Sequence, residues 1–377
     1  MIAKLKDRLV QNAVNFTGWE TNRKIVVIES DDWGMIRMAS KEAYQRFVQK
    51  GYPVQNCEYN SNDALESNDD LELLLQVLQS VKDSNGNPAV ITTNTIVANP
   101  DFEKIKASGF QEYFFEPFTK TLARYPAHDK VLELHREGIK KKMLQPQLHG
   151  REHINIPNWL KALQQNETIA MDAFEENMFT VSKGGKSNCN KEYLDGFGTF
   201  TNDALQQLEG VVKDAANLFE EIWGFRSSSV IAPCYTWHTG AEKYFHQNGI
   251  RFMQGGRVQN EPNLLQGQGY IRKRHYTGQR NKLGQIYLVR NAAFEPSSNP
   301  GFDWVSTCLA EIKNSFLWGK PAIISAHRLN FIGYINPQNR SNNLLLLTQL
   351  LKKIKQHWPQ VEFLSTDKLG DLISSNK

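Results

Sequence analysis

Residues 25–34 read Ile-Val-Val-Ile-Glu-Ser-Asp-Asp-Trp-Gly, and this stretch indicates the fold more directly than any other part of the chain. Four consecutive apolar β-formers are typical of a strand that is buried on both faces, as parallel strands of α/β proteins are. Two adjacent carboxylates, Asp31 and Asp32, follow at the end of that strand. Functional groups of α/β folds gather at the carboxyl ends of the strands, and two neighbouring carboxylates there need a cation or a shared proton. The stretch therefore predicts a metal site or an acid–base site at one edge of a parallel sheet.

Strand-like and helix-like segments alternate along the rest of the chain. After the first strand, the expected strands are 88–94, 143–148, 229–232, 250–254, 285–290, 322–325 and 361–364. The expected helices are 68–82, 129–141, 202–223, 241–247, 304–317 and 344–358. This alternation predicts an α/β fold, an irregular (deformed) β/α barrel of about seven to eight parallel strands, with an open doubly wound sheet as the alternative. We expect a single domain over 1–377, with loop insertions at about 182–200 and 256–284.

Composition narrows the class of protein. The chain has 377 residues, of which 40% are hydrophobic, enough for a large core. A net charge of +4 gives no general affinity for polyanions, so no nucleic-acid partner is expected. The four cysteines form no C-x-x-C pair, which argues against a zinc ribbon or a disulfide framework. No apolar run approaches the roughly 18–20 residues of a membrane span, and no signal peptide is recognisable, so we expect a cytoplasmic protein.

Two further strands are followed by histidines. Residues 147–153 read Gln-Leu-His-Gly-Arg-Glu-His, and His149 and His153 can face one direction if the loop turns helically. Imidazole pairs of this kind bind zinc and related divalent metals, although the order is not the H-E-x-x-H of zinc proteases. The apolar segment 321–326 leads to His327, and a histidine suits the role of general acid. Each histidine alone is explained equally well as a hydrogen-bonded loop residue. Together, the three strand ends predict a catalytic site.

The order Asp-Asp-x-Gly, His-x-x-x-His, Ala-Pro-x-Tyr and a strand that ends in His resembles the polysaccharide deacetylase family of carbohydrate esterases, of which this chain looks like a divergent member. The resemblance is confined to short motifs between residues 25 and 327. It implies an irregular β/α barrel that removes acetyl groups from N-acetylated sugars with a divalent metal. Zinc is the metal that it favours, with cobalt, nickel or iron as alternatives.

The resemblance also implies roles for individual residues. It makes Asp31 the catalytic base and His327 the general acid, and its metal ligands are Asp32, His149 and His153. The segment Ala232-Pro233-Cys234-Tyr235 is similar to the family's Arg-Pro-Pro-Tyr, in which the tyrosine N–H helps to hold the oxyanion and its ring shapes the acetyl pocket.

Several positions depart from the family pattern. Trp33 stands between the second Asp and Gly34, where the family reads Asp-Asp-Gly. The family's arginine has no counterpart at the same spacing, which leaves Arg226 and Arg290 as alternative partners for Asp31. Asp303-Trp304 either echoes the family's Asp-Trp motif or begins a helix. Trp237, together with Tyr235 and Phe331, either stacks on sugar rings or packs in the core.

These observations predict a hydrolase that removes an N-acetyl or O-acetyl group from an amino sugar or a glycan intermediate. Two alternatives stay open: hydrolysis of a non-peptide C–N bond in a small molecule, and a carbohydrate-binding relative without catalysis. A basic segment that includes residues 272–274, Arg-Lys-Arg, either is a solvated hairpin or contacts the phosphate of a phosphate-linked sugar.

Overall fold

The computed structural model describes residues 12, 14–181 and 192–375. Among these residues, nine strands form one sheet in the order β10-β7-β6-β5-β2-β1-β12-β11, with β13 beside β1, and every pair is parallel. The strands are β1 (Ile25–Trp33), β2 (Ile91–Ile96), β5 (Leu144–Gly150), β6 (Ser229–Ile231), β7 (Phe252–Gly255), β10 (Ile286–Val289), β11 (Ala292–Ala293), β12 (Ala322–His327) and β13 (Glu362–Phe363).

The sheet curls until its two end strands meet in one stretch of chain. Only Arg290 and Asn291 separate β10 from β11. The Arg290 N–H donates to Gly255 of β7 at 2.9 Å, and the Asn291 N–H donates to Ile323 of β12 at 3.0 Å. This stretch, which we call the seam (residues 286–293), therefore joins the two sides of the sheet. The predicted deformed β/α barrel of about seven to eight parallel strands is confirmed: leaving out the two-residue β13, the path from β10 to β11 has eight strands, or seven if β10 and β11 count as one.

The inside of the barrel is apolar at one end and polar at the other. Ile25 and Val27 of β1 point into the same apolar cluster as α14 (Thr366–Ser375), which packs against β1 and β10. Their even-numbered neighbours, Val26 and Ile28, pack in the main core. Because side chains alternate along a strand, Glu29 continues the inner face toward the carboxyl end. The polar end is therefore the one at which the predicted site residues lie.

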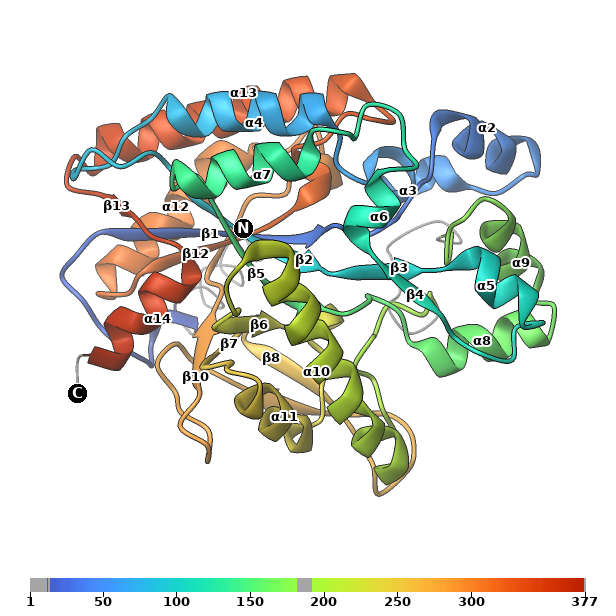
Figure 1. Cartoon of the computed structure of the whole chain (residues 1–377). Helices are drawn as coiled ribbons and strands as arrows, with labels where there is room; N and C mark the ends of the chain where they lie inside the picture. Colours follow the sequence, from blue (N-terminus) through green and yellow to red (C-terminus); the bar gives the residue numbers. More distant parts are fainter. Residues whose placement is uncertain (1–11, 13, 182–191, 376–377) are drawn as a thin grey trace, which may run out of the picture.

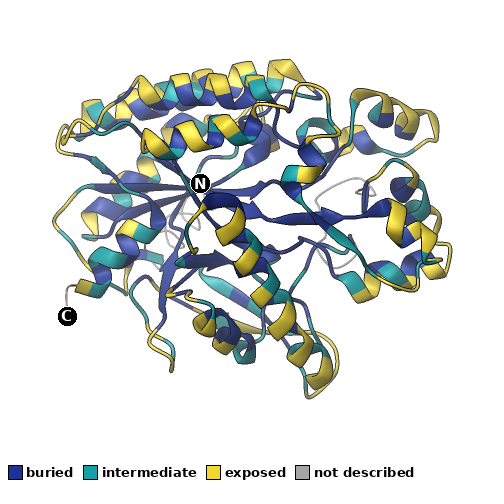
Figure 2. Ribbon diagram, viewed as in Figure 1, coloured by how far each residue is buried: buried dark blue, intermediate teal, exposed yellow. Residues whose placement is uncertain are grey.

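Helices cover the outside of the sheet, and the strands between them are buried (Figures 1 and 2). On one side, α4 (Asn68–Gln79), α7 (Val131–Lys140), α12 (Trp304–Leu317) and α13 (Pro337–His357) pack next to one another (Figure 1). On the other side lie α10 (Asn202–Trp223) and α11 (Glu242–Gln247). The bounds predicted for α10 are confirmed: the Thr201 side chain accepts from the Ala204 N–H at its start, and Gly224, with φ 78°, ends it.

Long connections after β1, β2 and β5 build a second apolar core beside the barrel (right in Figure 1). They contain helices that the sequence did not predict: α2 (Lys41–Gln49), α3 (Glu58–Asn62), α5 (Phe102–Ala107), α6 (Phe118–Leu122), α8 (Ile156–Gln164) and α9 (Thr168–Glu175). A small hairpin of β3 (Ala98–Pro100) and β4 (Phe115–Pro117) joins them. The short 3-10 turns are η1 (Val54–Asn56), η2 (Pro233–Tyr235), η3 (Thr239–Ala241), η4 (Pro296–Ser298) and η5 (Arg328–Asn330).

The two predicted insertions differ in what can be described. Most of 256–284 is an antiparallel hairpin of β8 (Val258–Pro262) and β9 (Tyr270–Arg274) with its flanking turns. Of 182–200, residues 182–191 lie outside the described part of the chain. The single-domain organisation stays a prediction. Within the described residues, no helix combines the length and the apolar character that crossing a membrane requires.

Candidate metal centre and surrounding pocket

The two aspartates reach the same pocket because β1 is irregular at its end. Consecutive side chains of a regular strand point to opposite faces. Here the register of β1 against β2 shifts between Ser30 and Trp33, and Asp32 takes a left-handed φ of 75°. A bulge of this kind re-aims a side chain, and aspartate tolerates the left-handed region better than most residues. Asp31 and Asp32 therefore both line a cavity of about 300 Å³, while the ring of Trp33 is buried in the main core.

Asp32, His149 and His153 form a buried group whose ligand atoms all lie within 4.8 Å of one another. The Asp32 Oδ1 atom is 3.3 Å from His149 Nε2 and 3.5 Å from His153 Nε2. His149 comes from the end of β5 and His153 from the loop that follows. That loop does not turn helically, as the sequence had predicted; Gly150, with φ 139°, turns the chain instead.

The protonation of these groups suits a divalent cation. His149 Nδ1 lies 2.9 Å from the Ile231 carbonyl oxygen, which can only accept, so Nδ1 carries a proton and Nε2 is the ring nitrogen directed at Asp32. Burial lowers the pKa of His153 to about 4, so its ring is neutral at pH 7. Burial alone raises the pKa of Asp32, but the bond to His149 and the nearby histidines outweigh it, and the pKa falls well below its usual range. Two imidazole nitrogens and one carboxylate oxygen therefore lie close together, and this is a donor set that suits zinc.

Asp31 is held by an arginine in the seam. Arg290 donates from Nη1 to Asp31 Oδ2 at 2.8 Å and from Nη2 to Oδ1 at 2.6 Å, while its Nε donates to Glu29 at 2.7 Å. Asn94 also donates to Asp31, at 2.8 Å. Burial raises the pKa of Asp31, but the charge and hydrogen bonds of Arg290 outweigh it and lower the pKa to about 2. Asp31 is therefore an oriented, ionised carboxylate.

Of the two arginines that the sequence left open, Arg290 is the partner of Asp31. Arg226 lies before β6, at the amino edge of the sheet, and pairs with Glu220 at 2.9 Å on the surface. Parallel strands carry the site at their carboxyl edge, so a residue that precedes a strand lies at the wrong end of the barrel. The structure therefore places Arg226 away from the site, which corrects its assignment as a substrate-orienting residue.

His327 ends β12 and is paired with a carboxylate that the sequence did not reveal. Its Nδ1 lies 2.7 Å from Glu295 Oε1, and Asn330 donates to Glu295 Oε2 at 2.6 Å. Its Nε2 lies 3.8 Å from Asp31 Oδ2. Burial lowers the pKa of His327, but Glu295 and the two aspartates raise it well above its usual value. His327 is therefore cationic at neutral pH. Glu295 follows β11, a strand of two residues that has no apolar run by which it could be recognised in the sequence.

Tyr235 lines the pocket with its ring, and its hydroxyl accepts from Arg290 Nη1 at 3.2 Å. Its backbone N–H donates to the Ala232 carbonyl at 3.0 Å within η2, so the oxyanion role of that N–H stays a prediction. Cys234 and Tyr235 both have positive φ, at 55° and 53°. Cys234 is disulfide-bonded, Cys57 and Cys308 are free, and Cys189 lies outside the described residues.

Pro233 and Trp237 lie behind this wall and do not line the pocket. Pro233 is buried at the start of η2. Trp237 is 2% exposed; its indole N–H donates to Glu242 at 3.1 Å, and its ring stacks at 6.1 Å on His275. For Trp237 the structure favours core packing over a sugar-stacking surface.

The basic segment of the β8–β9 hairpin does not reach the pocket either. Arg272 and Arg274 are exposed on β9, and Lys273 pairs with Glu261 at 2.7 Å. The pocket instead contains two residues that the sequence analysis missed, Arg37 and Tyr59. The full lining is Asp31, Asp32, Met35, Arg37, Tyr59, His149, His153, Leu194, Ala232, Cys234, Tyr235 and His327.

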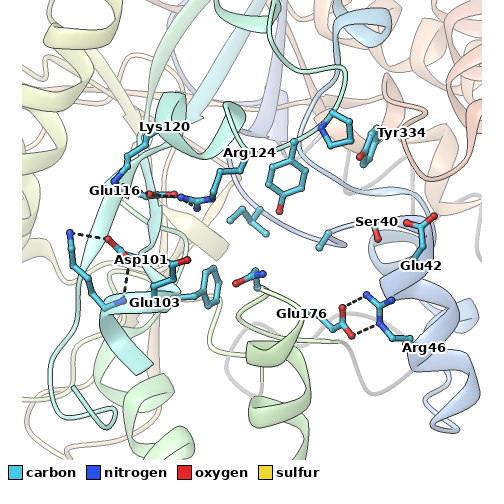
Figure 3. A pocket seen from close by; sticks show the side chains of 17 residues that line it. Ser40, Glu42, Arg46, Asp101, Glu103, Glu116, Lys120, Arg124, Glu176 and Tyr334 are labelled. Atoms are coloured by element: carbon cyan, nitrogen blue, oxygen red, sulfur yellow. Dashed lines mark hydrogen bonds and ion pairs between the residues drawn. The ribbon is translucent and has the colours of Figure 1, made fainter. Parts of the chain in front are cut away.

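A larger cavity of about 530 Å³ is lined by other residues, among them Ile36, the neighbour of the pocket residues Met35 and Arg37. Its walls carry charges that pair with one another (Figure 3). Ion pairs join Arg124 and Lys120 to Glu116, Arg46 to Glu176, and Lys104 to Asp101. These pairs take up seven of the nine charged side chains in the walls of the cavity, and none of the predicted catalytic residues lies in it.

No protein-family model and no curated protein matches the sequence. The similarities that were found are to solved structures. The chain is similar to a putative polysaccharide deacetylase from Mycobacterium smegmatis, with 10% identity over 95% of this chain and 93% of that one and a TM-score of 0.45. It is similar to Puue allantoinase, with 10% identity, 95% and 93% coverage and a TM-score of 0.47. It is also similar to a CE4 family pseudoenzyme from Bacillus anthracis, with 9% identity, 92% and 66% coverage and a TM-score of 0.36. Two of the similar structures are described as a putative and a probable polysaccharide deacetylase, and at this identity and TM-score they carry no conclusion about the chemistry of this chain.

Proposed function

We propose that this chain is a zinc-dependent hydrolase that removes an N-acetyl or O-acetyl group from an amino sugar or glycan. One observation carries the proposal: a buried Asp-His-His donor set lies in the same pocket as an ionised carboxylate, Asp31, and a cationic histidine, His327. The carbohydrate substrate rests on the sequence motifs, which resemble those of polysaccharide deacetylases.

The protein's own groups hold protons where amide hydrolysis needs them. A divalent metal held by Asp32, His149 and His153 would supply Lewis acidity toward the acyl oxygen and make water more acidic. Asp31, kept anionic by Arg290, accepts the proton of the attacking water. The cationic His327 donates its Nε2 proton to the departing amine, which leaves poorly unless it is protonated. Because Nε2 lies 3.8 Å from Asp31, both proton transfers take place in one pocket.

Metal content and turnover test the two halves of this proposal separately. After zinc loading, we expect about one zinc per chain by elemental analysis, and amine release from N-acetylglucosamine oligomers. Asp32→Ala loses both. Asp31 is not one of the metal ligands and asparagine has the same shape, so the Asp31→Asn variant should still bind zinc. Its kcat should fall at least about 100-fold, because the base is lost.

Two results would contradict the proposal in different ways. Failure to bind zinc would rule out the metal site. Zinc binding without turnover of any acylated sugar would rule out the deacetylase and favour either a hydrolase of another C–N bond or a carbohydrate-binding protein.

A further inference from the structure

Arg37 is a buried cation in the pocket with unused hydrogen-bonding capacity. It is 6% exposed and lines the cavity together with Asp32, His153 and Tyr59. A guanidinium has five N–H donors. None of them forms a hydrogen bond with a residue that the structure describes, and Nε is buried without a hydrogen-bond partner. A charge withdrawn from water in this way is costly unless an anion compensates it.

Asp63 forms a long ion pair with Arg37, which compensates part of its charge but leaves its N–H donors without a hydrogen bond. Asp63 Oδ2 lies 4.0 Å from Arg37 Nε, beyond hydrogen-bonding distance, and it also lacks a partner. The other oxygen of Asp63 accepts two bonds from Arg328, at 3.2 and 3.0 Å. Arg328 also reaches Glu66, and Arg290 binds both Glu29 and Asp31. Of these three buried arginines, Arg37 is the one whose N–H groups form no hydrogen bond within the described residues.

The position of Arg37 is fixed by its neighbours in the chain. The Ile36 N–H donates to the Asn99 side chain at 3.0 Å, and the Met38 N–H donates to the Asp63 carbonyl at 3.1 Å. The guanidinium lies over the ring of Tyr59, 5.0 Å from its centroid. Stacking on a ring leaves the edge of the guanidinium plane available for a planar or tetrahedral anion. The group is therefore presented to the pocket in a set orientation.

We propose that Arg37 is an anion-binding subsite of this pocket, and that the substrate carries a carboxylate or a phosphate close to the acyl group that is removed. That the anion belongs to a substrate rests on the proposed hydrolase function. That the pocket binds an anion rests on Arg37 alone. It assigns anion recognition to the pocket wall beside His153 and not to the exposed basic hairpin around Arg272.

Activity on matched substrates tests the inference. The substrates are N-acetylglucosamine, its 6-phosphate and N-acetylmuramic acid, which are neutral, phosphorylated and carboxylated. We expect the wild type to favour one anionic sugar over the neutral one in kcat/KM, and Arg37→Gln to lower that preference about 10- to 100-fold, mostly through KM. Which anionic sugar is favoured distinguishes phosphate from carboxylate. Arg37→Lys retains the charge but not the fork and should lose less, and Arg272→Gln is the control on the hairpin.

Binding of inorganic phosphate to the zinc-free protein, followed by calorimetry, tests the subsite without turnover. Phosphate binding that weakens at least tenfold in Arg37→Gln supports the subsite even if no sugar is hydrolysed, and in that case the proposed function alone fails. An unchanged preference and unchanged phosphate binding in Arg37→Gln overturn the inference. The inference is also overturned if Arg272→Gln, and not Arg37→Gln, lowers the preference for the anionic sugar. It is overturned as well if Arg37→Gln lowers kcat/KM equally for neutral and anionic sugars, because Arg37 would then act on the reaction in general.

Discussion

Replacing Glu295 by glutamine should move the pH range in which His327 works as an acid. The Glu295 and His327 side chains are 2.7 Å apart at Oε1 and Nδ1, and they are 16% and 25% exposed. Opposite unit charges about 4 Å apart attract by about 4 kcal/mol at an effective dielectric constant of about 20, which equals about 3 pKa units. Partial exposure to solvent reduces that figure. We therefore expect the pKa of His327 to fall by about 1 to 2 units in Glu295→Gln.

The sign of the effect follows from the form of His327 that reacts. Glu295 raises the pKa of His327, and the protonated form is the one that donates to the leaving group. Activity is therefore lost as the pH rises through this pKa. With the pKa lowered, the alkaline limb of the kcat/KM profile should move to lower pH by the same 1 to 2 units.

Two substrates make the assay specific. An N-acetyl sugar needs its amine protonated on departure, whereas the nitrophenolate of 4-nitrophenyl acetate leaves without a proton. The shift should therefore appear with the amide and be small with the ester, and the ester also reports whether the variant is folded and metal-loaded. An alkaline limb that stays in place for the amide, or that moves equally for both substrates, would refute the acid role of His327.

Two further predictions concern stability, measured by urea unfolding of the metal-free protein. Arg328 is completely buried between two carboxylates, so Arg328→Met should lower the free energy of unfolding by about 3–5 kcal/mol. Arg23→Met is the control: it removes an ion pair in which the arginine is 43% exposed, and it should lower the free energy of unfolding by at most about 1 kcal/mol. A Cβ on Gly370 of α14 would lie 2.6 Å from the buried ring of Phe252, so Gly370→Ala should cost about 1–3 kcal/mol. Gly210→Ala, at an exposed position of α10 with open space around it, should instead stabilise the protein by about 0.5–1 kcal/mol. Equal costs within either pair would contradict the packing described above.

The sequence predicts those parts of the fold that local chemistry determines. The strand at 25–30 is recognisable from its apolar run, and the helix over 304–317 from its periodicity. The structure confirms that Asp303 begins this helix, because its carboxylate accepts from the Ser306 N–H at 3.0 Å. The same observation shows that Asp303 does not serve as a counterpart of the family's Asp-Trp motif. In this pocket the carboxylate that pairs with the histidine is Glu295.

The residues that escaped sequence analysis acquire their roles through long-range contacts. Tyr59 lies in the five-residue helix α3 and Arg37 in the irregular segment after β1, and neither forms a motif with its neighbours in the sequence. Glu295 lies 32 positions before its histidine partner, after a strand too short to recognise. Their roles depend on the register between strands that are distant in sequence, which no local pattern encodes. By contrast, Asp31 and Asp32 were identified because two adjacent carboxylates after a buried strand are unusual in themselves.

The seam explains why Asp31 and His327, the proposed base and acid, lie in one pocket. The seam closes the barrel between β7 and β12; it contains Arg290, and Glu295 follows it two residues after β11, five positions from Arg290. Arg290 reaches across to Asp31, and Glu295 reaches His327 at the end of the strand beside β11. One short segment therefore orients the ionised base and charges the acid. Both assignments depend on the register of this segment, so a shift of the seam by one residue would turn both side chains away from the pocket at once. In this chain, the segment that closes the barrel also supplies Arg290 to the site and leads directly to Glu295.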